Sequence, residues 1–379
     1  MNPIYLDCNA TTPIDPVVLE VLRFYMEVEY GNAGSRTHQY GAAAKQAVQK
    51  ARKLIAKVVE AGADEIIFTS GATESNNICI LGLEQHGLET GKRHIITSAI
   101  EHKAVLEPCF AMKQKGFHVT VLPVDRQGWV DPDALTSALR PDTLLVSIMQ
   151  VNNETGIRQP LREIADALKD HEAYLHTDAA QGFGKDIDII RNKRLDLISI
   201  SGHKIFAPKG IGALVMRRRG FERPPLKPIV YGGGQERGLR PGTLPVALIA
   251  ALGKAAEIAL EQNEARRDAC LRFRQAALDG LSSLKPKFTG DQERVMEHVL
   301  NVSFPGLDSE AAMLLIKDVV AISNGSACTS SSYQPSHVLK AMGMSDDEAN
   351  ACLRFSWCHL TPDVDWDDVV DKLKVACDT

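Results

Sequence analysis

Short β-prone runs alternate with helix-like segments through the middle of this chain, and this alternation limits the folds that it can adopt. Helical segments around residues 73–90, 102–115, 131–139 and 160–169 separate most of the runs. Strands joined by helices of this length pair in a parallel or mixed sheet with helices on both faces, so the pattern predicts an α/β fold. The runs are Ile66–Thr69, His94–Thr97, His118–Val124, Leu144–Gln150, Tyr174–Thr177, Leu195–Ser201 and Ala213–Met216.

The last third of the chain has a different texture, which predicts a second, smaller domain. Residues 246–284 are rich in Ala, Leu and Glu and favour one or two long helices. A strand at Val299–Phe304, a helix at Ser309–Asp318 and a final helix at 363–376 follow. A length of 379 residues can support two cores. We expect a large domain over residues 16–250, and a small α+β domain formed by residues 1–15 and 251–379.

Charge and composition exclude several classes of protein. The formal net charge is −5, which gives no basis for a nucleic-acid or membrane surface. No long uncharged apolar run occurs, and the first residues lack the basic and apolar regions of a signal peptide. The eight cysteines are scattered, without a Cys-x-x-Cys pair or zinc spacing. We therefore expect a cytoplasmic protein with free thiols and no metal.

A lysine directly follows one of the predicted core strands. The segment Leu195–Gly210 runs from that strand through His203 and Lys204 to a Pro-Lys-Gly turn. An ammonium held near apolar surroundings is desolvated, which lowers its pKa and suits Schiff-base chemistry. A lone lysine in such a place is more often an exposed loop residue. Partners for a pyridoxal 5′-phosphate (PLP) cofactor elsewhere in the chain favour the Schiff-base interpretation.

Three strand-to-helix junctions carry groups that suit such a cofactor. Residues 69–75 could direct backbone N–H groups and a helix N-terminus at a phosphate. An ordinary N-capped loop between a strand and a helix would have a similar sequence. Asp178 could hold a protonated ring nitrogen, or could act as a helix N-cap. His102 could stack on a planar ring and move protons, or could be structural.

Two further residues suggest a reaction. Cys328 lies in the small, polar loop 323–335, where a thiolate could attack and then carry a product away. The alternative is an incidental surface thiol. Arg354 lies in the apolar run Leu353–Trp357, where an inward guanidinium needs an anion. A substrate carboxylate and a structural ion pair both meet that need.

These residues lie in motifs that resemble a known family almost from end to end. The chain resembles the PLP-dependent cysteine desulfurases of the NifS/IscS type, within the fold type I (aspartate aminotransferase-like) enzymes. This resemblance implies a mixed seven-stranded sheet in the large domain. The motifs, in order, are YLDCNATTP, SGATES, EHKAV, VNNETG, HTDAAQ, SGHKIFAPKGIG, GGGQERGLRPGT, NGSACTS and LRFS.

The resemblance also implies how PLP is held. Lys204 would form the Schiff base, Asp178 would hold the pyridine nitrogen, and His102 would stack on the ring and act as an acid/base. Thr243 would reach the phosphate of the neighbouring subunit's cofactor, which implies a homodimer with shared sites. The remaining PLP contacts would be Gln181 at the ring hydroxyl, Asn153 close by, and Ala72, Thr73, Ser201 and His203 at the phosphate.

The implied reaction converts L-cysteine to L-alanine. Asn32 and Arg354 would hold the substrate carboxylate, Lys204 would remove the Cα proton, and Cys328 would attack the substrate sulfur. The persulfide on Cys328 would then pass to an acceptor protein in iron–sulfur cluster assembly, RNA thio-modification or DNA phosphorothioation. The Ser-x-Gly-Ser-Ala-Cys-Thr-Ser pattern is typical of the branch with a long cysteine loop.

The chain departs from the family pattern at three places. Gly31-Asn32-Ala33-Gly34-Ser35 replaces Gly-Asn-Pro-Ser-Ser, and Cys8 interrupts the N-terminal polar run. Trp357 and Cys358 replace a glycine-containing stretch after Arg354. These departures indicate a specialised sulfur donor, and the desulfurase of the DNA phosphorothioation (Dnd) system is one candidate.

Two other functions remain open from the sequence. A related fold type I enzyme, such as a selenocysteine lyase or an aminotransferase, would share the PLP residues, but an aminotransferase has no use for Cys328. A non-catalytic scaffold for sulfur-acceptor proteins would have no physical need of Lys204, Asp178, His102 and Cys328. A colourless purified protein would favour the scaffold.

Overall fold

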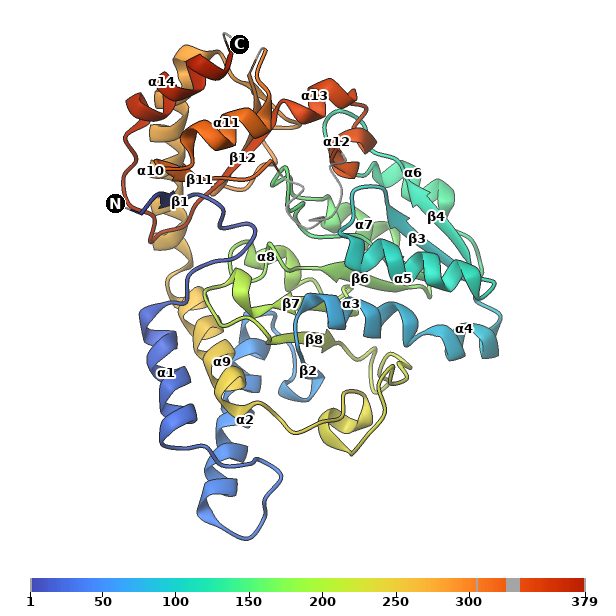
Figure 1. Ribbon diagram of the computed structural model, residues 1–379. Helices are drawn as coiled ribbons and strands as arrows, with labels where there is room; N and C mark the ends of the chain where they lie inside the picture. Colours follow the sequence, from blue (N-terminus) through green and yellow to red (C-terminus); the bar gives the residue numbers. More distant parts are fainter. Residues whose placement is uncertain (1, 305, 325–334, 378–379) are drawn as a thin grey trace.

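The computed structural model describes residues 2–304, 306–324 and 335–377 of the 379-residue chain. Figure 1 shows a large part built around a central sheet and a smaller part above it, where the two chain ends also lie. The N-terminal segment passes from the smaller part into the larger one before the first long helix.

The large part is built on a mixed sheet of seven strands, as the family resemblance implies. Their order is β2-β8-β7-β6-β5-β3-β4, and β8 is antiparallel to both its neighbours while the other pairs are parallel. The strands are β2 (Ile66–Thr69), β3 (His94–Ser98), β4 (His118–Leu122), β5 (Thr143–Ser147), β6 (Tyr174–Asp178), β7 (Leu197–Ser201) and β8 (Gly212–Met216).

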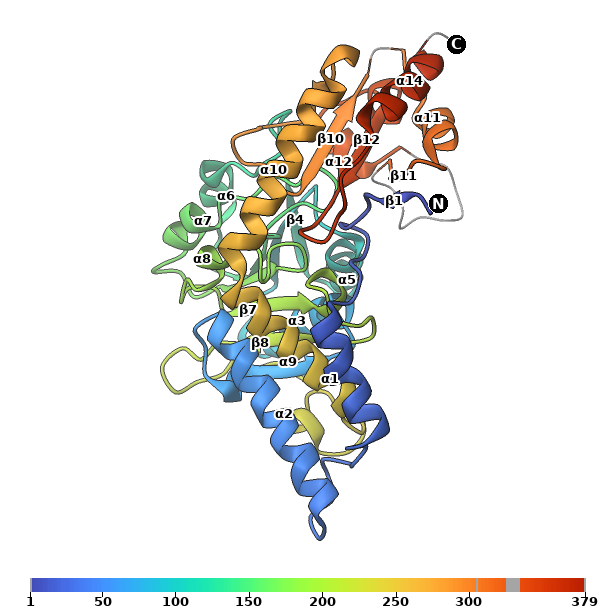
Figure 2. The ribbon, with the colours of Figure 1, turned by 90° about the vertical axis from the view of Figure 1, so that its left-hand side faces the viewer.

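Helices cover both faces of this sheet because its strands are apolar on both sides. In β2, Ile66 and Phe68 pack into one core, and Ile67 packs into the core on the opposite face. Helices α1, α2 and α9 lie side by side on the face of the sheet to which Ile66 and Phe68 point (Figure 2). The helices of the large part are α1 (Pro16–Glu27), α2 (Gln39–Val58), α3 (Ala72–Leu81), α4 (Glu84–Thr90), α5 (Lys103–Gln114), α6 (Pro132–Ala138), α7 (Leu161–Ala167), α8 (Ile187–Ile190) and α9 (Val246–Glu261).

The smaller part has its own core and two small sheets. One has the antiparallel order β12-β10-β9, and the other pairs β1 with β11 in parallel. Trp357, fully buried, lies in this core, and its Nε1 donates to the carbonyl of Cys270 at 3.0 Å. The elements are β1 (Ile4–Tyr5), α10 (Asn263–Leu281), β9 (Lys287–Phe288), β10 (Val299–Ser303), α11 (Ser309–Ile316), β11 (Val320–Ala321), α12 (His337–Ala341), α13 (Asp346–Asn350), β12 (Cys352–Ser356) and α14 (Trp366–Cys377).

The helical stretch 246–284 contains two helices that serve different cores. Helix α9 packs against α1 and α2, whereas α10 packs against α14. The expected boundary at residues 250 and 251 falls inside α9, whose Ala251 and Leu252 lie in the core of the large part. We propose that the domains divide at Gln262, between the two helices.

The arginine run 217–219 directly follows β8, and such a position predicts a solvated strand end. Arg218 and Arg219 are exposed as predicted, but the prediction is wrong for Arg217, which is buried and donates to the carbonyls of Val59 and Ile190, the latter at 2.7 Å. Its guanidinium satisfies backbone acceptors at the ends of neighbouring elements.

In the described part of the chain, no helix is long and apolar enough to cross a membrane.

A buried ion pair joins α2 to the edge of the sheet. Arg52 Nη2 lies 2.6 Å from Glu236 Oε1, with the side chains 9% and 2% exposed. Glu236 Oε2 also accepts from the backbone N–H of Phe68 at 2.7 Å. The glycine-rich loop 232–234 before Glu236 thus leads to a structural carboxylate.

Glu236→Gln should destabilise the protein by about 3–5 kcal/mol, because it leaves the Arg52 guanidinium buried without its counter-charge. Urea unfolding followed by circular dichroism measures the change. The matched control is Glu172→Gln, which removes the exposed partner of Lys92 and should leave the urea midpoint almost unchanged. Equal effects of the two substitutions would contradict a structural role for the Arg52–Glu236 pair.

Candidate active site

A cavity of about 430 Å³ lies where β5, β6 and β7 end and the two parts of the molecule meet. Ligands of open α/β sheets bind outside the carboxyl ends of the strands in this way. The cavity brings together most of the predicted site residues, namely Ala72, Thr73, His102, Asn153, Asp178, Gln181, Ser201, His203, Lys204 and Arg354.

Asp178 ends strand β6 at the buried side of the cavity. Its Oδ2 accepts from Asn76 Nδ2 at 2.7 Å, and its Oδ1 accepts from the backbone N–H of Ala180 at 2.9 Å. These two donors fix the carboxylate in a site where it is only 6% exposed. Sequence reasoning missed Asn76, although it lies one helical turn after Ala72 and therefore on the same face of α3.

Lys204 lies in the turn after β7, and the N-terminal segment crosses in front of it. Lys204 Nζ donates to the carbonyls of Asn9 and Ala10, the latter at 2.8 Å. The Asn9 carbonyl also accepts from Gln181 Nε2 at 2.9 Å. The Asn9 backbone therefore aligns two predicted site residues. In the sequence, Asn9 stands out only as part of the N-terminal polar run within the motif YLDCNATTP.

The N-terminus of α3 faces the same cavity. Ala72 and Thr73 begin this helix, and their N–H groups have no acceptor within it, as at every helix start. Ser201 and His203 line the cavity with them. Burial first, and then the charge of Lys204, lower the pKa of His203 to about 4, so its ring is neutral at pH 7. This corner can accept an anion such as a phosphate.

His102 is the N-cap of α5. Its Nδ1 accepts from the backbone N–H of Ala104 at 3.0 Å, so a neutral ring carries its proton on Nε2. The preceding Glu101 is fully buried, and its Oε1 accepts from Ser98 Oγ at 2.6 Å and from the Met149 N–H at 2.9 Å. Burial nevertheless raises the pKa of Glu101 to about 8.

Arg354 projects from β12 into the cavity and is 2% exposed. Its Nη2 pairs with Asp7 Oδ1 at 2.7 Å, and its Nη1 donates to the Asn153 carbonyl at 3.0 Å. The structural ion pair that the sequence left open is therefore present. Arg354 Nε is buried and has no hydrogen-bond partner among the described residues, so this side of the guanidinium can still receive an anion.

Two predicted site residues, Asn32 and Thr243, are not brought to this cavity. Asn32 and Thr243 are exposed and do not line it, and Asn32 Oδ1 accepts from the Gly34 N–H at 2.8 Å. Cys328 lies outside the described residues. Their assigned roles stay predictions.

The described residues contain no group of three or more His, Cys, Asp or Glu placed to hold a metal ion. His176, which precedes Asp178 by two residues, hydrogen-bonds Ser147 Oγ at 2.7 Å and Ser199 Oγ at 3.0 Å. Burial lowers the pKa of His176 to about 4. The histidine is thus satisfied within the sheet.

Comparison with known proteins identifies the family. The family profile for class-V aminotransferases matches residues 4–369. The mitochondrial cysteine desulfurase of Drosophila melanogaster is 46% identical over 373 residues, which cover 98% of this chain and 80% of the relative. Cysteine desulfurase IscS of Vibrio campbellii is 44% identical over 377 residues, which cover 99% and 92%.

Solved structures give the same result. DndA from Streptomyces lividans is 50% identical, with a TM-score of 0.82 over 92% of this chain and 98% of that one. A structure of SspA in complex with cysteine is 37% identical, with a TM-score of 0.83 over 95% and 100% of the two chains. The chain therefore belongs to the class-V aminotransferase family, which has the PLP fold type I. Within this family it is one of the cysteine desulfurases, as the motifs predicted.

The cysteine desulfurases are PLP-dependent enzymes, and the residues of the cavity fit that cofactor. A fixed carboxylate, a lysine and a helix N-terminus surround one space large enough for it. Gln181 Oε1 is buried and has no hydrogen-bond partner among the described residues, so it can accept from a ring hydroxyl.

The buried Glu101 should make the stability of the protein depend on pH. Because its folded-state pKa is about 8 and its ordinary value is 4.5, its contribution is complete below pH 4.5 and is lost as pH rises to about 8. Glu101→Gln removes this titration. The urea midpoint of the wild type should therefore fall relative to that of the variant between pH 5 and pH 9. Glu107→Gln, on the exposed face of α5, is the control, and a pH-independent difference for Glu101→Gln would contradict the raised pKa.

Proposed function

We propose that this chain converts L-cysteine to L-alanine with PLP held by Lys204 and leaves a persulfide on Cys328 for an acceptor protein. The observation that carries the proposal is the single cavity shared by Lys204, Asp178, His102 and Arg354 in a chain of the cysteine desulfurase family. The solved complex of the relative SspA with cysteine supports the substrate.

The residues around the cavity divide the binding of PLP between them. Lys204 would hold the cofactor covalently, Asp178 would pair with its ring nitrogen, and His102 would lie against the ring. Bound PLP supplies an electron sink for charge that develops at the substrate Cα. Contacts to the ring hydroxyl and the phosphate would come from Gln181, Asn153, Ala72, Thr73, Ser201 and His203.

Proton transfer would depend on two side chains. The amine of Lys204, released when the substrate amine takes its place, would accept the Cα proton. The Asn9 and Ala10 carbonyls, which accept from Lys204 Nζ, would guide that amine. His102 would donate or accept at Nε2, because its Nδ1 is engaged by the Ala104 N–H.

The sulfur step would use Cys328. Its thiolate would attack the substrate sulfur, so that a sulfur–sulfur bond forms while the carbon–sulfur bond breaks. The electron pair of the broken bond remains with the carbon skeleton, which takes up a proton and leaves as L-alanine. Arg354 would hold the substrate carboxylate and direct its sulfur toward Cys328.

The likeness to DndA favours a thio-modification acceptor, with DNA phosphorothioation as our choice among the acceptors. We further propose a homodimer, in which Thr243 reaches the phosphate of the cofactor in the neighbouring subunit. A cytoplasmic location agrees with the free thiols of the described cysteines, since a reducing compartment preserves them.

Alanine formation from L-cysteine in the presence of a thiol reductant tests the proposed reaction. The wild type should form alanine, Cys328→Ser should keep bound PLP but form none, and Lys204→Ala should lose the covalent attachment and the activity. Cys377→Ser, at the end of α14, controls for the loss of a thiol and should behave as the wild type. Alanine from Cys328→Ser at the wild-type rate, or none from a PLP-loaded wild type, would contradict the proposal.

Arg354→Lys should raise the KM for L-cysteine roughly tenfold or more, a change of about 1.4 kcal/mol, because lysine cannot supply the guanidinium fork. Bound PLP should be unchanged. Steady-state alanine assays over a range of cysteine concentrations measure KM and kcat separately. Arg267→Lys, whose side chain is 59% exposed, is the control. An unchanged KM would exclude Arg354 as the carboxylate ligand.

A further inference from the structure

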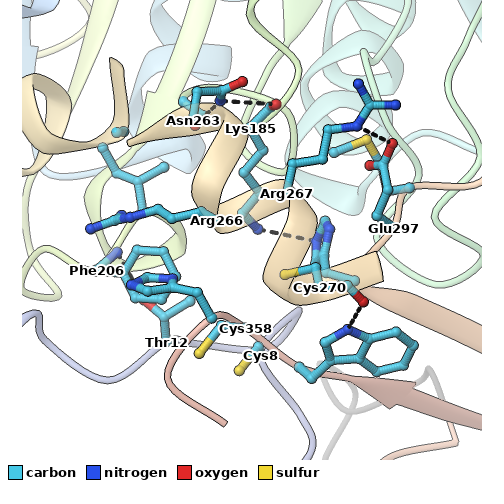
Figure 3. Close-up of a pocket in the computed structure, with 17 residues that line it drawn as sticks. Cys8, Thr12, Lys185, Phe206, Asn263, Arg266, Arg267, Cys270, Glu297 and Cys358 are labelled. Carbon is cyan, nitrogen blue, oxygen red and sulfur yellow. Dashed lines mark hydrogen bonds and ion pairs between the residues drawn. The ribbon is translucent and has the colours of Figure 1, made fainter. Parts of the chain in front are cut away.

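A second cavity, of about 50 Å³, contains thiol groups that the proposed function does not use. Figure 3 shows Cys8 from the N-terminal segment, Cys270 from α10 and Cys358 from the chain after β12, with Lys185 and Thr12 also lining the space. The departures from the family pattern at Cys8 and Cys358 meet in this cavity, although 350 positions separate them in the sequence.

Cys8 and Cys358 are direct neighbours. The backbone N–H of Cys8 donates to the Ser356 carbonyl at 2.9 Å, which aligns the N-terminal segment with the chain that leaves β12. The two side chains pack together with Phe206 and are 1% and 6% exposed. Figure 3 shows both side chains at the same cavity. The thiols are free in this structure.

The surroundings shift the pKa values of the two thiols in opposite directions. Thr361 Oγ1 donates to the Cys358 sulfur at 3.7 Å. The neighbouring Cys8 side chain is the largest of the effects that lower the pKa of Cys358 against the cost of burial. The neighbouring Cys358 and burial raise the pKa of Cys8. Cys358 is therefore the better nucleophile, and Cys8 retains its proton.

A cation next to the pair favours a thiolate. Lys185 Nζ lies 3.2 Å from His298 Nε2, and both residues line the cavity. Burial lowers the pKa of Lys185, and the charges that oppose this effect come from Cys8, Cys270 and Cys358. A thiolate at Cys358 and an ammonium at Lys185 thus stabilise one another.

We propose that Cys8 and Cys358 form a peroxide-reactive dithiol site that closes to a disulfide. The size of the cavity selects the oxidant. One water needs roughly 10–15 Å³ of such volume, so about 50 Å³ admits a molecule of the size of hydrogen peroxide but not a peptide disulfide such as oxidised glutathione. Lys185 and Thr12 supply polar contacts for the bound peroxide.

The chemistry is a two-electron oxidation in two steps. The Cys358 thiolate attacks one oxygen of hydrogen peroxide; the O–O bond breaks, a sulfenic acid forms, and the departing hydroxide takes up a proton to become water. The Cys8 sulfur then attacks the sulfenic sulfur, so that the S–S bond forms and the S–O bond breaks. The Cys8 proton leaves with the hydroxyl group as a second water. Two thiols and one peroxide thus give one disulfide and two waters.

The bond would join two segments that reach the candidate active site. Asp7, before Cys8, pairs with Arg354 on β12, and the carbonyl of Asn9, after it, accepts from Lys204. The disulfide would tie the N-terminal segment to the chain leaving β12. The proposal of this dithiol site does not depend on the proposed desulfurase activity, because neither Cys8 nor Cys358 takes part in that reaction.

Peptide mapping under non-reducing conditions tests the site in the PLP-loaded Cys328→Ser protein, where the proposed catalytic thiol cannot compete. After hydrogen peroxide treatment and alkylation, the Cys8–Cys358 cross-link should be at least tenfold more abundant than any other cysteine pair. Dithiothreitol should reverse it. Oxidised glutathione at the same concentration should produce little of it. Alkylatable Cys8 and Cys358 after peroxide treatment, or a dominant link to Cys270, would overturn the proposal.

Single variants separate the roles of the two thiols. Dimedone should label Cys358 in Cys8→Ser treated with peroxide, since the sulfenic acid has no partner, and should not label Cys8 in Cys358→Ser. Cys270→Ser is the matched control from the same cavity and should retain the cross-link. Labelling of Cys8 instead of Cys358 would reverse the assignment. Because the mapping itself uses both native thiols, it decides the proposal even where a variant folds poorly.

Discussion

The backbone carbonyl of Asn9 is the acceptor around which the candidate active site is arranged. It receives hydrogen bonds from Lys204 and from Gln181, which come from different strand ends of the large sheet. The Asn9 side chain donates to the Asn153 carbonyl at 3.0 Å, and the Asn9 N–H donates to Ser356 Oγ at 2.9 Å. One short extended segment therefore joins the large sheet to β12. Without this segment, Lys204 would lose two of the acceptors that orient it, and the large sheet would lose these links to β12.

Burial of charge is the second constraint on this region. Asp178 is fixed by donors from α3 and from its own turn, and Arg354 is paired with Asp7. Buried charges need such partners because the interior solvates them poorly. The same groups would meet charges of a bound cofactor and substrate: the ring nitrogen at Asp178 and a carboxylate at Arg354 Nε. The partners thus keep the groups charged and oriented in advance of binding.

The sequence predicted the sheet, because strands that are buried on both faces consist of apolar runs that can be recognised in the sequence. It singled out Lys204, Asp178 and His102 from their places at the ends of predicted strands, and these residues line one cavity, while their roles stay predictions. Asn9 could not be predicted, since its contribution is a backbone carbonyl and depends on a long-range crossing of the chain. Arg217 was assigned wrongly because its acceptors are carbonyls distant in sequence. The break between α9 and α10 at Gln262 also depends on which core each helix packs against, and not on local propensity. The pairing of Cys8 with Cys358 likewise appears only once the chain is folded.

The most direct test of the central claim is to locate the lysine that holds PLP. Borohydride reduction of the PLP-loaded protein fixes the Schiff base as a stable secondary amine, and mass spectrometry of the digested protein then identifies the modified residue. The account predicts the phosphopyridoxyl group on Lys204 alone. A label on Lys185 or Lys209, the other lysines that line the two cavities, or no label in a protein with bound PLP, would contradict it.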